Sequence, residues 1–534
     1  MTEEMKKRID QIYERWTNGL CPGGQVLIRE KGEIVYDRCF GYSDIENRIP
    51  ITDQTVFHVA SVSKQFTVMG AMLLWEDGKL DIDADVRAYI PEFIHFEEAV
   101  TVRDLMNNDT GIRDFFELAD RSGVINCDAL DQDYVLRLIG KQKGLNFPPR
   151  SRHLYSNSNF ILLASIVEKI SGMTLSAFLD KRIFKPLGMT QTAVRDKYWT
   201  CLDHRSASYQ DNGYNYYYAP LTYSIYGTTS LNTTAHDLMK WMDNYRTPKI
   251  CSEKTIQVMT TAAVLDGNAP NTYACGLRED YLEGHRYIKH AGEDAGFRTF
   301  TFRLMDDDID IVKLANCDTI LSDPSTMEVA RILLDLPSAP APELPIDENF
   351  DAETAPGFYY GKDGAAAVTI VKYKDGLAVE QQWGPTPLTH IRGNLYRAGH
   401  LDVWYLLGER DARYVNAEET ILLAKSNDNP VDEALGQTAA GRYFSEEAEA
   451  VYTVMWEDGH LYLEHIRRGR SLLHPTDDGR FAAEYDRTTY VRFIWAGEKV
   501  VGLTLTGSRV LELPFKKLKE ESSDAYRLHR SLSC

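Results

Sequence analysis

The chain has 534 residues, of which 43% are hydrophobic, and a formal net charge of −20 at pH 7. This length exceeds what one hydrophobic core supports, so two or three domains are expected. The negative charge and the lack of a basic stripe argue against a nucleic-acid partner. Because no apolar run of 18 residues occurs and residues 1–9 are charged and amphipathic, we expect neither a membrane partner nor a signal peptide.

The cysteines and histidines give no metal or disulfide pattern. Eight cysteines run from Cys21 to Cys534 without paired spacing, which is typical of free thiols in a reducing compartment. Neither CxxC nor HExxH occurs. We therefore expect a cytoplasmic protein with no metal and no cofactor.

The first part of the chain predicts a helix to about Trp16 and then two strands, residues 24–29 and 33–41, joined at Lys31-Gly32. Apolar residues at helical spacing on more than one face of residues 62–75 predict a helix that is buried on most sides.

Ser61 and Lys64 lie three residues apart where this helix begins, so their side chains project from one face. A serine hydroxyl becomes a good nucleophile when a base accepts its proton, and a lysine can be that base only when it is uncharged. Lowering a lysine pKa from ~10.4 to roughly 7–8 takes about 4 kcal/mol of desolvation or charge repulsion. On its own, such a pair is more often a helix cap and an exposed lysine.

The middle of the first domain predicts a helical lobe, and its end predicts strands again. We expect one antiparallel sheet formed by the first and last segments, an α+β fold with the helical lobe against one side and the nucleophile at the junction. The predicted helices are residues 102–107, 134–141, 159–170, 175–183, 234–245 and 325–334, and the predicted strands are 285–290, 297–304 and 309–316.

Two further motifs complete a candidate catalytic set. Tyr155 and Asn157 are two residues apart on a segment expected to be extended, so they point the same way. A predicted strand reaches His290, and Gly292 would let a substrate backbone lie against its edge. Singly, these residues suit a core phenol and a surface histidine. The order Ser-x-x-Lys, Tyr-x-Asn, His-x-Gly within about 330 residues favours a single site.

The last 190 residues predict two small antiparallel β-barrels after a proline-rich linker at 337–345. Three short motifs recur about 84 residues later, such as residues 357–359 at 441–443. The expected domains are 1–336, 346–430 and 431–534. We assign no chemistry to the barrel histidines, which are His390, His400, His465 and His474.

The motifs at residues 61–67, 102–114, 155–160 and 290–292 resemble those of the penicillin-recognising serine hydrolases. This class C β-lactamase-like family includes D-alanyl-D-alanine carboxypeptidases, esterases and D-aminopeptidases. The resemblance is greatest to the three-domain D-aminopeptidases and runs over nearly the whole chain. It implies a β-lactamase/transpeptidase-like domain followed by two β-barrels.

The resemblance also implies a role for each motif residue. Ser61 would be acylated, Lys64 and Tyr155 would share the proton transfers, and Asn157 would hold the substrate amide. The third motif, His290 to Gly292, would line the site, with His290 as part of the catalytic set. The backbone N–H groups of Ser61 and Glu293 would bind the oxyanion.

Position 290 limits the expected substrate. β-Lactamases of this type have a lysine there, whereas Lys289 is one residue out of register and would point to the opposite face of the strand. We therefore expect D-aminopeptidase-like or D-amino-acid amidase-like hydrolysis of a small amide or peptide. The alternatives are a carboxylesterase, a D,D-carboxypeptidase or β-lactamase-like hydrolase, and a non-catalytic module that binds peptidoglycan fragments or a protein. A homodimer is left open.

One departure from the family concerns the amine of the substrate. D-Aminopeptidases use a long loop of the last barrel to cover the site and help bind that amine, but here residues 486–489 form a short connection. Glu293 and Asp294 could bind an ammonium group instead, or be solvated turn residues.

Overall fold

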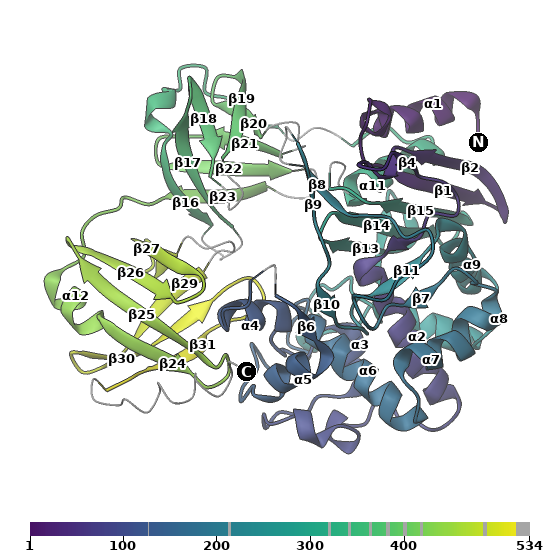
Figure 1. Cartoon of the computed structure of the whole chain (residues 1–534), viewed down its shortest axis with the longest axis horizontal. Coiled ribbons are helices and arrows are strands. Elements are labelled where there is room, and N and C mark those ends of the chain that lie inside the picture. Colours follow the sequence, from purple (N-terminus) through teal and green to yellow (C-terminus); the bar gives the residue numbers. More distant parts are fainter. Residues whose placement is uncertain are drawn as a thin grey trace. The chain divides into compact units, whose positions relative to one another are not determined.

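The computed structural model describes residues 1–125, 128–211, 215–318, 322–339, 343–361, 366–380, 385–398, 403–416, 420–483 and 489–519. The chain forms two compact units. One contains Met1–Phe115 and Cys127–Pro345, and the other contains Phe116–Asn126 and the two barrels (Figure 1). The predicted domain boundaries stay predictions.

A six-stranded antiparallel sheet forms the centre of the first unit. Its order is β12 (Arg278–Leu282), β13 (His285–Asp294), β14 (Phe297–Leu304), β15 (Ile309–Ala315), β1 (Gly24–Glu30) and β2 (Glu33–Phe40). The pairing of β1 with β15 joins the two ends of the domain, as predicted. Lys31 and Gly32 have φ values of 52° and 86° and make the tight turn between β1 and β2.

Helices cover both faces of this sheet. The helices α1 (Glu3–Ile12) and α11 (Ser322–Leu333) lie on the face that presents Phe300 and Phe302. The helices α2 (Ser63–Glu76) and α9 (Ala235–Arg246) lie on the other face, where Gln65 donates a hydrogen bond to Thr301 and accepts one from Trp241. Because successive side chains of a strand alternate between faces, β14 is buried on both.

The helical lobe contains the predicted helices, most of them with ends that differ from the predicted ones by a few residues. Its helices include α3 (Val102–Asn107), α5 (Gln132–Gly140), α6 (Asn157–Ser171), α7 (Leu175–Leu179) and α8 (Lys185–Leu187). The helix predicted at 159–170 begins two residues earlier, so Asn157 is helical rather than extended. The one predicted at 175–183 is α7 followed by a π-helical turn at Asp180–Phe184.

In the part of the chain that the structure describes, no single helix has both the length and the hydropathy of a membrane span. Asn157–Ser171 and Leu175–Leu187 meet the criterion only together, as a pair bent by 72°.

The second unit contains two closed eight-stranded antiparallel barrels, which confirms the predicted fold of this region. The first barrel is β16 (Gly357–Gly361), β17 (Ala367–Tyr373), β18 (Gly376–Val379), β19 (Thr386–Arg392), β20 (Leu395–Ala398), β21 (Val403–Leu407), β22 (Asp411–Asn416) and β23 (Thr420–Lys425). The second is β24 (Gly441–Ser445), β25 (Ala450–Glu457), β26 (His460–His465), β27 (Gly469–Pro475), β28 (Phe481–Ala483), β29 (Thr489–Ala496), β30 (Lys499–Thr506) and β31 (Leu513–Lys517).

The sequence repeat is also a structural repeat. The Tyr359 hydroxyl donates to the Ala355 carbonyl at 2.6 Å in the first barrel, and the Tyr443 hydroxyl donates to the Ala439 carbonyl at 2.5 Å in the second. Each contact ties the first strand of a barrel to the residue four positions before it.

The sequence also led to predictions for single histidines, for the short connection at residues 486–489 and for the cysteines. His474 is buried, stacks on Phe358 at 4.0 Å between ring centroids and forms a hydrogen bond with Asp428, which fits a structural role. His400 and residues 486–488 of the short connection lie outside the described residues. None of the six cysteines that the structure describes forms a disulfide.

Candidate active site

The turn that carries Ser61 is strained and firmly held. It links β5 (Phe57–His58) to α2 through a 3-10 turn at Ala60–Val62, and Ala60 has a φ of +47°, a left-handed conformation that is costly for alanine. The Ser63 hydroxyl donates to the Ala60 carbonyl at 2.6 Å, and the Thr299 hydroxyl donates to the Val59 carbonyl at 2.9 Å. Ser61 itself stays partly exposed at the start of a helix that is otherwise buried.

Lys64 is fully buried, and its amine faces Ser61. The Nζ atom lies 2.9 Å from the Ser61 Oγ, 2.9 Å from the Asn157 Oδ1 and 3.0 Å from the Thr228 carbonyl oxygen. A protonated amine has three hydrogens, and these three acceptors use all of them. When the amine is neutral, its lone pair can take the Ser61 proton at this distance.

Asp114 orients the amide that faces Lys64. The Asn157 backbone N–H and its Nδ2 both donate to the Asp114 Oδ2 at 2.7 Å. The Asn157 Oδ1 therefore faces Lys64, and it also accepts a hydrogen bond from the Thr228 hydroxyl at 2.6 Å. Asn157 thus orients the amine, in addition to any contact that the remaining N–H of its amide makes with a substrate.

Aromatic rings surround the amine. The Lys64 Nζ is 4.8 Å from the ring centroid of Tyr155 and 5.3 Å from that of Phe160. The Tyr155 ring lies 6.2 Å from His290 and 6.0 Å from Tyr273. The structure therefore brings together Ser61, Lys64, Tyr155, Asn157 and His290, the five side chains proposed from the sequence.

His290 is a neutral imidazole in this site. Burial, and then the nearby charge of Lys64, lower the pKa of His290 to about 3. Its Nδ1 lies 2.6 Å from the Ala291 carbonyl and donates to it, so Nε2 is left as an acceptor, 3.4 Å from the Tyr273 hydroxyl. Lys289 lies instead over the rings of Tyr287 and Phe300, on the opposite face.

The end of β13 forms an open edge beside Ser61. Strand β12 stops opposite Lys289, so residues 290–294 pair only with β14. Because Asp294 and Phe297 close a two-residue hairpin, the alternation of an antiparallel ladder turns the N–H groups of Ala291 and Glu293 away from β14. The Glu293 N–H is thus free of the ladder, as an oxyanion donor requires.

The position of Gly292 has a structural requirement for glycine. A Cβ at this position would lie 2.3 Å from both the Val59 carbonyl oxygen and the Thr299 hydroxyl. The glycine thus lets β13 approach the turn that carries Ser61, and its expected role beside a substrate backbone stays a prediction.

Two contributors were missed from the sequence. Asp114 stands in one of the family-like motifs but had no assigned role, and Thr228 lies in a loop without a distinctive pattern. No local signal identifies either one, because their partners are at least 43 residues away. Within the described ranges, no group of three or more His, Cys, Asp or Glu side chains is arranged to hold a metal ion.

Comparison with known proteins gives consistent matches. Residues 9–334 match the family described as Beta-lactamase. The chain is similar to Penicillin-binding protein 4* of Bacillus subtilis (strain 168), 27% identical over 389 residues that cover 69% of this chain and 86% of that protein. It is also similar to the D-aminopeptidase of Cereibacter sphaeroides (strain ATCC 17023), 26% identical over 452 residues that cover 83% of each chain.

Some solved structures with the same fold match nearly the whole chain, whereas others match about three fifths of it. The octameric penicillin-binding protein homologue from Pyrococcus abyssi has a TM-score of 0.56 at 19% identity and covers 96% of this chain and 99% of its own. The D-amino acid amidase from Ochrobactrum anthropi SV3 has a TM-score of 0.53 at 20% identity, covering 62% of this chain and 99% of its own.

Proposed function

This chain belongs to the Beta-lactamase family, and on that premise we propose that it is a serine hydrolase that cleaves small amides or peptides bearing a free D-amino acid at the amino end. The family resemblance stated from the motifs is confirmed. The observation that carries the proposal is the buried amine of Lys64 at 2.9 Å from the Ser61 hydroxyl.

In the proposed mechanism, neutral Lys64 takes the proton of Ser61 as its Oγ attacks the substrate carbonyl carbon. The oxyanion accepts hydrogen bonds from the Ser61 and Glu293 N–H groups. The amine leaves after it receives a proton from Lys64, with the Tyr155 hydroxyl relaying it. Water then attacks the acyl-enzyme by the same proton path, and Ser61 is regenerated.

The substrate class rests on two supports. D-Aminopeptidases are among the similar curated proteins, over most of the length of both chains. In addition, the neutral His290 offers no positive charge for a substrate carboxylate, which disfavours β-lactams and carboxypeptidase substrates. The alternatives of an esterase and of a non-catalytic binding module have no specific structural observation in their favour.

A substrate screen tests this assignment. We expect D-alanyl p-nitroanilide to be cleaved at least about tenfold faster than its L-isomer, since a chiral pocket discriminates by 1.4 kcal/mol or more. Cleavage of p-nitrophenyl butyrate alone would indicate an esterase instead.

Ser61→Ala should reduce this turnover to background, because the nucleophile is gone and no acyl-enzyme can form. Ser165→Ala is a matched control, since that hydroxyl donates a hydrogen bond to the carbonyl of Ile161 in its own helix. Turnover by the Ser61→Ala protein at the wild-type rate would reject the mechanism.

A further inference from the structure

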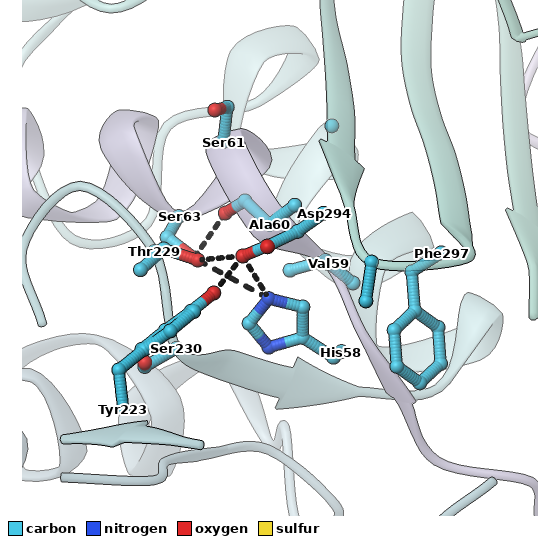
Figure 2. A network of polar contacts seen from close by, with 12 residues as sticks. His58, Val59, Ala60, Ser61, Ser63, Tyr223, Thr229, Ser230, Asp294 and Phe297 are labelled. Atoms are coloured by element: carbon cyan, nitrogen blue, oxygen red, sulfur yellow. Dashed lines mark hydrogen bonds and ion pairs between the residues drawn. The ribbon is translucent and has the colours of Figure 1, made fainter. Parts of the chain in front are cut away.

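Four polar side chains, of which His58 and Thr229 are buried and Tyr223 and Asp294 are partly buried, form a hydrogen-bonded network near the turn that carries Ser61. His58 is 2% exposed, and its Nε2 is 3.1 Å from the Asp294 Oδ2. The Thr229 hydroxyl donates to the same oxygen at 3.1 Å, and the Tyr223 hydroxyl also bonds to it. One carboxylate oxygen thus accepts three hydrogen bonds (Figure 2).

The network joins segments that are far apart in the sequence. His58 is in β5, Tyr223 is in β10 (Tyr223–Ser224), Thr229 precedes β11 (Leu231–Thr233), and Asp294 ends β13. These positions span 236 residues, from His58 to Asp294.

Each of three members stands close to a group that acts on the substrate in the proposed mechanism. His58 is three residues before Ser61, and Asp294 directly follows Glu293. Thr229 directly follows Thr228, whose carbonyl accepts a hydrogen bond from Lys64. The network therefore ties together the segments that carry the two oxyanion donors and one that holds the base.

The network is separate from the hydrogen bond that the Ser61 hydroxyl makes with Lys64. In Figure 2 the Ser61 side chain points away from the dashed contacts, and the Asp294 carboxylate points toward His58. The Asp294 side chain is 18% exposed, and its Oδ2 is fully occupied by His58, Thr229 and Tyr223. The Oδ2 atom of Asp294 thus belongs to the network, and the expectation that Glu293 and Asp294 bind a substrate ammonium group stays a prediction.

The protonation state of His58 follows from its surroundings. Burial lowers the pKa of His58, and the charges of Arg205 and Arg195 lower it further, although the Asp294 carboxylate acts in the opposite direction. The imidazole is therefore uncharged at neutral pH and donates through Nε2–H to Asp294. Two hydroxyls and one N–H then share a single negative oxygen, which is a strong, directional arrangement of charge-assisted hydrogen bonds.

We propose that His58, Asp294, Tyr223 and Thr229 are positioning residues that fix the Ser61 N–H and the Glu293 N–H at the spacing required by the oxyanion. The proposal rests on the proposed function as a serine hydrolase. It accounts for the strained Ala60 turn, because a left-handed alanine persists only where the surrounding contacts hold it.

The test measures the reaction of Ser61 with a fluorophosphonate, whose phosphoryl oxygen occupies the oxyanion site. Asp294→Asn and His58→Asn should each slow labelling by about 10- to 100-fold, because a donor displaced by about 1 Å costs this much. His58→Gln places an amide N–H near the former Nε2 and should stay within about threefold of the wild-type rate.

The hydroxyl of Tyr223 provides a milder variant. Tyr223→Phe removes one of the three donors to Asp294 and should slow labelling by about tenfold. Tyr226→Phe is the matched control in the same segment, since its hydroxyl bonds to Glu168 at 3.4 Å, and it should label at the wild-type rate.

Rates are measured per folded molecule, with thermal unfolding followed in parallel. A purely structural role would lower the melting temperature and leave the labelling rate unchanged, which would overturn the proposal. Equal rates for His58→Asn and His58→Gln would overturn it as well. Failure of the wild-type protein to label at all would reject the proposed function itself, so the two failures are distinguishable.

Discussion

Two buried histidines, His58 and His290, and the partly buried His153 make the first unit sensitive to acid at the level of single residues. Burial is the main cause that lowers the pKa of His290 to about 3, that of His153 to about 4, and that of His58. Each is neutral in the folded protein and takes up a proton near pH 6.5 when unfolded. The stability that they contribute is present above about pH 6.5 and is lost as the pH falls below it.

Three carboxyl groups act in the opposite direction. Burial raises the pKa of Asp109 to about 8, so it is protonated in the folded protein at neutral pH and favours folding as the pH falls. Burial also raises the pKa values of Glu168 and Asp318, which further offset the effect of the histidines.

The three histidines are expected to outweigh these carboxyl groups, so the free energy of unfolding should fall between pH 6.5 and pH 5, by at most about 2 kcal/mol per pH unit, from the net proton uptake on unfolding. His153→Phe keeps the stacking on Tyr273, whose ring centroid is 4.8 Å away, and should make the slope shallower. The exposed His95→Gln should leave it unchanged. Urea unfolding at pH 7, 6 and 5 gives the slope, and equal stability at pH 7 and pH 5 would contradict this reading.

The strand β13 is the element on which the site depends most. Its open edge carries Glu293 and its neutral His290, and Gly292 brings it against the Val59 carbonyl. No other residue type fits at 292 without moving either the strand or the turn of Ser61.

Gly292→Ala should lower the catalytic rate by about 100-fold or more, because the added Cβ would lie 2.3 Å from two oxygen atoms and displace the oxyanion donors. Gly144→Ala is the control, since a Cβ there would meet nothing within 4 Å. Steady-state kinetics of both proteins checks this. A Gly292→Ala protein with normal kinetics would mean that β13 does not set the geometry.

At this same scale, local patterns predicted much of the fold. The spacing of apolar residues predicted α3 and β14 with their observed bounds. It also predicted the deep burial of α2. The start of α6 was missed, because Asn157 enters the helix while both its backbone N–H and its side chain bond to the distant Asp114.

The residues of the candidate site also fall into two groups, those that the sequence predicted and those that it did not. Ser61, Lys64, Tyr155, Asn157 and His290 could be selected because each stands in a short motif with a family resemblance. Asp114, Thr228 and the His58 network could not, because each acts through contacts between segments that only the folded chain brings together.

For the whole molecule, the two barrels extend the likeness to relatives well beyond the catalytic domain. The similar D-aminopeptidase of Cereibacter sphaeroides is matched over 83% of both chains, and the Pyrococcus abyssi structure over 96% of this one. The repeated tyrosine contacts, from Tyr359 and Tyr443, show one barrel design used twice. This internal repeat was visible in the sequence because each copy keeps its own local motif.

The proposed function of the whole molecule rests on Ser61 being activated by a neutral Lys64. The most direct measurement is intact-mass analysis of the full-length protein after reaction with a fluorophosphonate, followed by peptide mapping. We predict a single adduct on Ser61, absent in Ser61→Ala and formed at least about 100-fold more slowly in Lys64→Met, which lacks the base. An adduct on another residue, or labelling of Lys64→Met at the wild-type rate, would contradict the account.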